Sequence, residues 1–141
     1  MRELRTSKAF DIRFSEVDSM NVVWHGSYPL YLEDAREAFG AAFGLDYQGY
    51  FKHQCYAPIA EERIRYLHPL FYGMKPRVDI VYKPSPAAKV MFDYEIRDTR
   101  DETLIATAHS VQLFTDLNYQ QLLYRPEFYI RWQERWKVLD E

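Results

Sequence analysis

One long amphipathic segment, residues 28–43, constrains the fold most, because nearly everything after it has the pattern of β-strands. Within this segment apolar side chains recur at spacings of three and four, which places them on one face of a helix. Ser27 or Gly26 precedes the segment as a candidate N-cap, and Gly44 follows it as a plausible stop. We therefore predict a helix over residues 28–43 whose apolar face packs against a sheet.

Five segments have the pattern of β-strands. In the first, residues 9–14, the side chains of Phe10, Ile12 and Phe14 alternate with polar ones, which is the period of a half-buried strand. The other four strands are predicted at residues 56–67, 77–83, 90–96 and 104–115. Two shorter helices are predicted at residues 47–53 and 127–138. One strand, one long helix and about four mostly antiparallel strands predict an α+β fold, with the sheet wrapped around the helix.

Length and composition fit one domain over residues 1–141, with 48% hydrophobic residues to form its core. The net charge of −3 argues against nucleic acid or an anionic membrane as a partner. No segment approaches the roughly 18 apolar residues of a membrane-spanning helix, and the charged residues 1–10 do not resemble a secretory signal. Cys55 is the only cysteine, so no disulfide forms within the chain. The cytoplasm is the expected location.

The polar segment between the first strand and the long helix is where chemistry is expected. Asp18 follows the strand, and His25 lies at the start of the helix. The first N–H groups of a helix lack internal partners, and the helix dipole favours negative charge beside them. A carboxylate and free N–H donors are what acyl transfer requires. The residues alone leave a second interpretation open, in which Asp18 is a turn or cap residue.

Several segments of the chain resemble a known family. They are Arg13–Asp18, Asn21–His25, Tyr28, Tyr31–Arg36 and Ile64–Leu70. Together they resemble the 4-hydroxybenzoyl-CoA thioesterase family, and they are similar more narrowly to the acyl-CoA thioesterases associated with the Tol–Pal system. The resemblance implies a hot-dog fold, in which an antiparallel sheet of about five strands wraps around one long helix. It also implies a homodimer, or a homotetramer built from two dimers, with the active site between subunits.

The same resemblance implies roles for particular residues. Asp18 holds the position of the catalytic carboxylate, which either attacks the thioester carbonyl or activates a water molecule. The backbone N–H of His25 would polarise that carbonyl, and the His25 side chain would position substrate or water. The implied substrate-binding residues are Asn21, Trp24, Tyr28 and Tyr66. The implied substrate is an acyl-CoA thioester, and no cofactor is expected.

Two departures from the family pattern are visible. Asn21 stands where the family usually has glycine, and we predict a positive φ there, because asparagine accepts this conformation best after glycine. Met74 and Lys75 follow Gly73 at a point where relatives commonly carry an aspartate. We expect that second change to affect local geometry rather than chemistry.

Other candidate residues offer less. The histidines His25, His53, His68 and His109 have no spacing typical of metal ligands, so no metal site is expected. Glu61 and Glu62 are adjacent on a strand and must point to opposite faces, and we expect a solvated pair. Lys83 and Lys89 flank a proline-rich loop and could meet the phosphates of CoA. Exposure to solvent alone is the alternative role for these lysines.

Other functions of the same fold compete with acyl-CoA hydrolysis. One alternative is a thioesterase that acts on acyl-carrier protein. A hydratase or dehydratase requires an acid–base pair, and His25 and Glu33 supply the residue types without a matching motif. A non-catalytic acyl-binding protein would not depend on Asp18, so substitution of this residue discriminates between the hypotheses.

Overall fold

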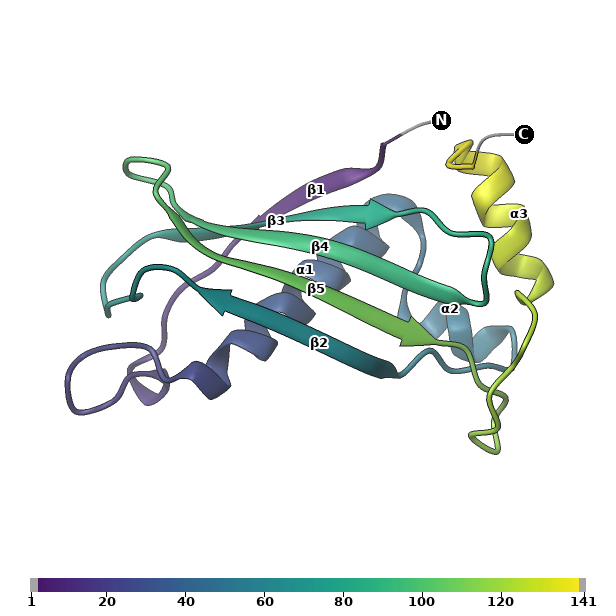
Figure 1. Cartoon of the computed structure of the whole chain (residues 1–141), viewed down its shortest axis with the longest axis horizontal. Helices are drawn as coiled ribbons and strands as arrows, with labels where there is room; N and C mark the ends of the chain where they lie inside the picture. The colour runs from purple at the N-terminus through teal and green to yellow at the C-terminus, as the bar shows by residue number, and fades with distance from the viewer. Residues whose placement is uncertain (1–2, 140–141) are drawn as a thin grey trace.

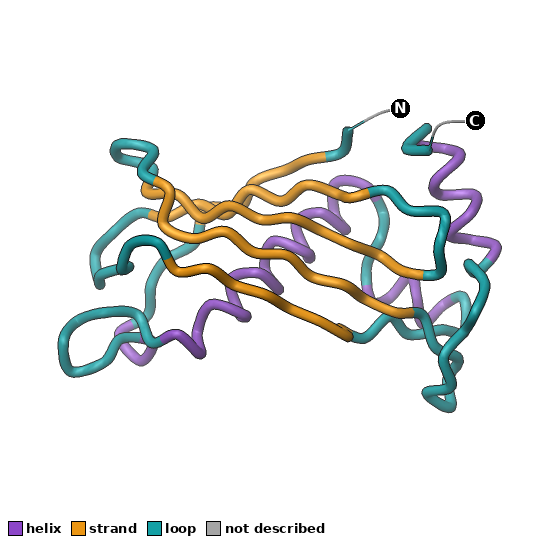
Figure 2. The backbone as a smooth tube through the Cα atoms, in the orientation of Figure 1, coloured by secondary structure: helices purple, strands orange, loops and turns teal. Residues whose placement is uncertain are grey.

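Five antiparallel strands form one sheet in the order β1-β3-β4-β5-β2, and the long helix α1 crosses behind it (Figure 1, Figure 2). The computed structural model describes residues 3–139. The strands are β1 (Arg5–Ala9), β2 (Ile59–Tyr66), β3 (Pro76–Lys83), β4 (Lys89–Asp98) and β5 (Leu104–Leu113). The helices are α1 (Tyr28–Phe43), α2 (Tyr47–Lys52) and α3 (Glu127–Trp136), with short 3₁₀ helices η1 (Phe14–Glu16) and η2 (His25–Ser27). The predicted α+β fold is confirmed.

The helix α1 has the predicted bounds, Tyr28–Phe43. Gly44 ends it in the left-handed region with φ 93°, which glycine adopts without a steric penalty. Gly40 allows the following chain to fold back closely, since a Cβ at this position would lie 2.8 Å from the Leu45 carbonyl oxygen. The carboxylate of Asp46 then caps α2 by accepting a backbone hydrogen bond at 2.7 Å. These contacts fix the corner between the two helices.

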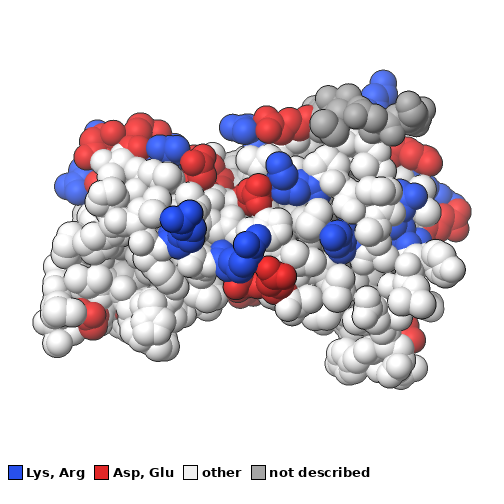
Figure 3. Space-filling view, viewed as in Figure 1, with Lys and Arg blue, Asp and Glu red and all other residues white. Residues whose placement is uncertain are grey.

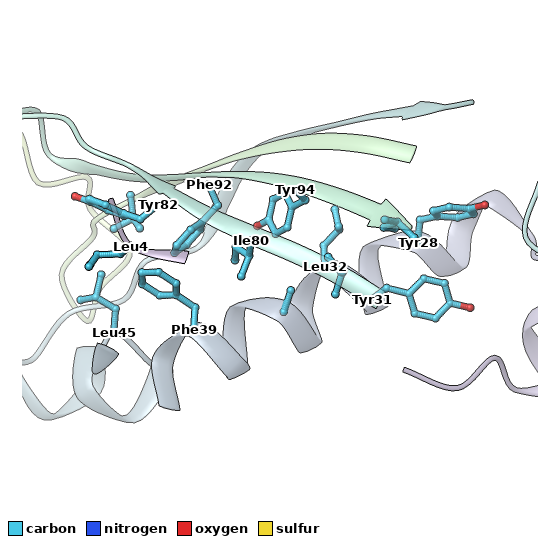
Figure 4. Close-up of a cluster of buried hydrophobic side chains, with 14 of the residues drawn as sticks. Leu4, Tyr28, Tyr31, Leu32, Phe39, Leu45, Ile80, Tyr82, Phe92 and Tyr94 are labelled. Atoms are coloured by element: carbon cyan, nitrogen blue, oxygen red, sulfur yellow. The ribbon is translucent and has the colours of Figure 1, made fainter. Parts of the chain in front are cut away.

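The core lies between the apolar face of α1 and the inner face of the sheet (Figure 4). Leu32 and Phe39 project from the helix and are fully buried against Ile80 and Phe92 of the strands. The rings of Phe39 and Phe92 are 4.9 Å apart between centroids. Burying one such side chain contributes about 1.5–3 kcal/mol to stability. The alternation predicted for β3 and β4 is confirmed by this inward-facing layer, which holds the helix in place behind the sheet.

The first strand differs from the prediction. It covers Arg5–Ala9 instead of residues 9–14, and it forms an edge of the sheet beside β3. Most of its side chains face solvent, so no apolar alternation marks it in the sequence. Phe10 and Ile12 are buried, but they lie in an extended segment after the strand. Phe14 begins η1 and is 76% exposed, so the predicted alternation does not extend to it.

The later elements match the prediction closely. The strands β2 and β5 are shorter than predicted, because Tyr56 and Thr115 pair only through an isolated bridge beyond them. The predicted last helix is confirmed as α3, and the Trp132 indole N–H donates to the Phe43 carbonyl at 2.7 Å. This contact docks α3 at the end of α1. No helix within residues 3–139 is long and apolar enough to cross a membrane.

A polar network crosses the core between α1 and β2. The Arg36 guanidinium donates to the Tyr94 hydroxyl at 3.0 Å and lies 3.4 Å from the Glu62 carboxylate. The Tyr94 hydroxyl also lies 2.6 Å from the Ser110 hydroxyl. The side chains of Arg36 and Glu62 are only 16% and 19% exposed. The predicted solvated pair is therefore wrong for Glu62, because alternate strand residues face inward while Glu61 faces out.

Candidate active site

The loop between η1 and η2 folds back on itself and is anchored to the chain that follows β2. Its two arms pair at Val17 and Val23, and the Val23 N–H donates to the Leu70 carbonyl at 2.8 Å. At its tip the Asn21 N–H donates to the Asp18 carbonyl at 3.0 Å. The positive φ predicted for Asn21 is confirmed at 66°. The loop is therefore a defined hairpin-like structure in which Asn21 provides the turn.

Asp18 lies on this loop with an exposed side chain. Its Oδ1 accepts the Met20 N–H at 2.8 Å and the Val22 N–H at 3.2 Å. Within residues 3–139, no hydrogen-bond donor or cation engages its Oδ2. The interpretation of Asp18 as a turn residue is thus confirmed for one carboxylate oxygen. Its catalytic role stays a prediction.

The start of the helical segment offers two backbone donors. The Ser27 N–H donates to the Trp24 carbonyl at 2.9 Å, and the Tyr28 N–H donates to the His25 carbonyl. The N–H groups of His25 and Gly26 have no acceptor within the described residues, as expected for the first positions of a helix. A Cβ at Gly26 would lie 2.3 Å from the Trp24 ring, so a larger residue here would require the exposed Trp24 side chain to move.

Backbone pairing connects the loop of residues 17–24, which carries Asp18 and which we name the carboxylate loop, to the start of η2. The Trp24 N–H donates to the Glu16 carbonyl at 2.8 Å, one step beyond the pairing of Val17 with Val23. The Glu16 carboxylate accepts the Tyr31 hydroxyl of α1 at 3.0 Å. Burial, together with this hydrogen bond, raises the pKa of Tyr31 far above its usual range. The position of the loop relative to α1 is thus fixed by main-chain and side-chain contacts.

A pocket of about 300 Å³, which we name the helix-start pocket, opens beside η2. It is lined by Val22, Val23, His25, Tyr28, Tyr66, Leu67, His68 and Pro69. The structure thus brings together His25, Tyr28 and Tyr66 among the residues predicted for the site. Burial raises the pKa of Tyr28 to about 12, and the neighbouring Tyr66 contributes to the rise. A backbone hydrogen bond at Leu70 lowers this pKa in part. Tyr28 is therefore a neutral wall of the pocket.

The remaining predicted site residues lie outside this lining. Asp18, Asn21 and Trp24 belong to the adjoining loop, and Trp24 is 56% exposed. Lys83 and Lys89 lie at the end of the sheet where β3 meets β4, opposite the loop (Figure 1). The Lys83 ammonium group lies 3.8 Å from an oxygen of Asp93. Within one chain, the two lysines are therefore not brought to the helix-start pocket.

A second pocket, of about 520 Å³, lies at the other end of β2, and we name it the aromatic pocket. Its lining combines rings with charged groups: Tyr47, Tyr50, Tyr56, Phe92 and Tyr119 with Glu33, Arg36, Glu37 and Asp46, among others. The Tyr56 and Tyr119 rings stack with centroids 5.3 Å apart. Sequence reasoning missed this pocket, because its walls come from α1, α2, β2 and the loop after β5. The high aromatic content, 17%, was its only signal.

The side chains of His109 and His68 contact neighbouring strands of the same chain. His109 Nδ1 lies 2.5 Å from an Asp93 carboxylate oxygen on the neighbouring strand, so the histidine is satisfied. The ring of His68 lies 3.0 Å from the Leu104 carbonyl. Within residues 3–139, no three histidine, cysteine or acidic side chains are grouped as metal ligands.

An antiparallel sheet wrapped around one central helix is the arrangement of the hot-dog class of proteins. Residues 12–133 match the family model of the thioesterase-like superfamily, and the chain belongs to that family. YneP of Bacillus subtilis (strain 168), provisionally assigned as an acyl-CoA thioesterase, is 24% identical over 123 residues, covering 87% of this chain and 89% of YneP.

Solved structures show the same fold. A DHNA-CoA thioesterase from Staphylococcus aureus superposes with a TM-score of 0.82 at 20% identity, covering 95% of this chain and 92% of that one. A 4-hydroxybenzoyl-CoA thioesterase variant in complex with 4-hydroxybenzoyl-CoA superposes with a TM-score of 0.78 at 15% identity, covering 91% and 97% of the two chains. The predicted hot-dog fold and thioester-hydrolase family are confirmed. The narrower likeness to the Tol–Pal branch stays a prediction.

Proposed function

We propose that this protein hydrolyses acyl-CoA thioesters to a free acid and CoA. The observation that carries the proposal is the Asp18 carboxylate, held at Oδ1 by two backbone N–H groups and open at Oδ2. Its loop is joined by backbone pairing to a helix start with free N–H donors at His25 and Gly26. A fixed carboxylate and unpaired donors are the two components that acyl transfer needs.

In the proposed reaction, the thioester carbonyl oxygen accepts the His25 N–H while its carbon is attacked. Asp18 either takes a proton from the attacking water or attacks directly to form an anhydride that water then opens. In both routes the carbon–sulfur bond breaks from a tetrahedral intermediate, and the CoA thiolate leaves and is protonated. The negative charge on the former carbonyl oxygen is stabilised by the N–H donor and by the positive end of the helix dipole. The Tyr28 and Tyr66 rings would pack beside the acyl group.

Substitution of Asp18 tests the proposal. In Asp18→Asn we expect release of free thiol from acyl-CoA to fall about 100- to 1,000-fold, as large an effect as the loss of a direct oxyanion donor. The reason is that the variant lacks the carboxylate that attacks the thioester or takes a proton from water. The amide oxygen can still accept both turn N–H groups, so the circular dichroism spectrum should not change. Asp11→Asn, at another exposed aspartate before the loop, is the matched control. Full turnover by Asp18→Asn would reject the mechanism.

The assay also separates the competing functions. Free thiol from acyl-carrier protein but not from CoA would favour a carrier-protein thioesterase, and binding without thiol release would favour a non-catalytic protein. A hydratase needs His25 and Glu33 near each other. In one chain Glu33 lines the aromatic pocket and His25 the helix-start pocket, at opposite ends of β2, so a hydratase site would have to take the two residues from different copies. The cytoplasmic location stays a prediction.

We further propose that the active unit is a homodimer joined along β2. This strand is an edge of the sheet, so its outer backbone groups are free to pair with a second copy. In an antiparallel, twofold pairing centred on β2, residues 66–69 of one copy lie beside residues 56–59 of the other. These two segments line the helix-start pocket and the aromatic pocket, respectively. The pairing would therefore join the two pockets across the interface.

Exposed apolar side chains support this pairing. Phe14, Met20, Trp24 and Tyr72 lie on or beside the carboxylate loop and are each at least half exposed. On the face seen in Figure 3, the lower left part of the molecule, where this loop lies, shows few charged side chains, whereas the upper left part is strongly charged. Large exposed apolar patches mark contact surfaces.

Mixing two inactive variants tests the shared site. Ala57→Trp fills the aromatic pocket, and Asp18→Asn removes the carboxylate. If each site takes Asp18 from one copy and the aromatic pocket from its partner, a mixed dimer contains one intact site. An equimolar mixture that is unfolded and refolded together should recover about a quarter of the wild-type activity. No recovery, with mixed dimers verified by mass spectrometry, would place each complete site within one chain.

A further inference from the structure

Tyr66, the last residue of β2, connects the sheet to the start of the helical segment. Its hydroxyl donates to the His25 carbonyl oxygen at 3.3 Å. Its ring meets the Tyr28 ring edge-on, with 4.8 Å between centroids. Tyr28 is buried, whereas Tyr66 is 49% exposed and lines the helix-start pocket. The packing against a buried ring therefore holds the Tyr66 hydroxyl at the wall of the pocket.

The His25 carbonyl and the Gly26 N–H belong to the same peptide group. This peptide is trans, so the two groups point in opposite directions. The carbonyl accepts two hydrogen bonds, one from the Tyr28 N–H and one from the Tyr66 hydroxyl. Hydrogen bonds at a carbonyl polarise the peptide and strengthen its N–H as a donor. The Gly26 N–H, which has no acceptor within residues 3–139, is thus made a stronger donor by Tyr66.

We propose that Tyr66 is a positioning residue, which orients and polarises the Gly26 N–H as a second donor to the thioester carbonyl oxygen. This role rests on the proposed hydrolysis. The His25 N–H, from the preceding peptide, is the first donor. Its own peptide carbonyl, that of Trp24, accepts one backbone hydrogen bond, from Ser27. The two donors are therefore unequal, and the Gly26 N–H is the one that depends on the sheet.

The role differs from direct substrate contact, which is how the sequence resemblance assigns Tyr66. A substrate contact formed equally in the ground state and the transition state affects KM, whereas a donor to the developing oxyanion affects kcat.

The first test is Tyr66→Phe, which keeps the ring packed on Tyr28 and removes only the hydroxyl. We expect kcat to fall about 2- to 8-fold, because an indirect hydrogen bond changes the strength of an oxyanion donor by about 10–30%. KM should change by less than the change in kcat. Tyr124→Phe, at an exposed tyrosine that lines neither pocket, is the control and should retain wild-type kcat. A Tyr66→Phe enzyme with unchanged kcat, or with its whole loss in KM, overturns the proposal.

The second test measures polarisation directly. The acyl-CoA that the wild-type enzyme cleaves fastest is labelled with ¹³C at its carbonyl and bound to Asp18→Asn, and its infrared carbonyl band is recorded. Removal of the Tyr66 hydroxyl in this background should move the band part of the way back towards its frequency in water. An unchanged band would show that Tyr66 does not act on the carbonyl. Failure of the proposed function is distinguishable, because the wild-type enzyme would then release no thiol.

Discussion

The helix-start pocket and the aromatic pocket lie at opposite ends of β2 and are built in different ways. The helix-start pocket, about 300 Å³, is bordered by backbone donors of η2 and by a loop held through main-chain hydrogen bonds. The aromatic pocket, about 520 Å³, is lined by side chains of several elements, and one of them, Arg36, pairs with Glu62. The comparison teaches that polar groups have different tasks at the two ends. At one end the Asp18 carboxylate and the N–H groups of His25 and Gly26 lack an internal partner on at least one side, and at the other Arg36 is largely buried and paired with Glu62 and Tyr94.

The largest expected difference between the two regions is in stability, at Arg36. Arg36→Met leaves Glu62 and Tyr94 without their partner in a place with little solvent. We expect a loss of about 2–3 kcal/mol in the free energy of unfolding, less than for a fully buried pair because both side chains keep some exposure. Urea unfolding followed by circular dichroism measures the loss. Asp18→Asn, in the other region, should change this free energy by less than about 0.5 kcal/mol.

A double-mutant cycle sharpens this result. Replacing both partners in Arg36→Met/Glu62→Met should recover more than half of the lost stability, because no unpaired charge remains buried. Arg63→Met breaks an exposed pair with Glu61 on the outer face of the same strand and should cost about 0–1 kcal/mol. If the exposed and the buried pair cost the same, the contrast between the two regions is wrong.

A smaller effect is expected at Asn21, in the loop of the helix-start pocket. Asn21→Ala should cost about 1 kcal/mol, since an alanine at φ 66° lacks the local hydrogen bonds that make asparagine tolerable there. Asn21→Gly should be nearly neutral in stability, because glycine adopts this conformation freely. Thermal unfolding of the two variants measures the difference. Asn118→Ala, at an exposed asparagine outside the left-handed region, is the control, and equal losses for all three variants would contradict the backbone explanation.

The sequence allowed prediction of those parts of the fold that local periodicity records. The bounds of α1 were predictable from its apolar spacing and from Gly44, and β3 and β4 from their alternation. The strand β1 was not, because an exposed edge strand buries too few side chains to show a period. The positive φ of Asn21 was predictable because asparagine stands where the resembled family usually has glycine, and asparagine accepts this conformation best after glycine.

The candidate site was predictable only in part. Asp18, His25 and Tyr28 lie within eleven residues of one another in the sequence. Their roles were predicted from the resemblance to the thioesterase family. The contact between Tyr66 and the His25 carbonyl joins residues 41 positions apart, and it depends on how β2 ends beside η2. The inward turn of Glu62 depends on strand register against Arg36 of a distant helix. Neither relation leaves a pattern in the local sequence.

The strand β2 has a consequence for how the enzyme responds to its own concentration. Tyr66 at its end holds the His25 carbonyl, and Leu70, four residues later, accepts a hydrogen bond from the carboxylate loop. In the proposed dimer the same strand forms the seam between the copies. Dimer formation would then restrict the motion of the strand that holds both the η2 peptide and the loop of Asp18. In the proposed dimer, dilution below the dissociation constant should therefore lower the turnover of each protomer.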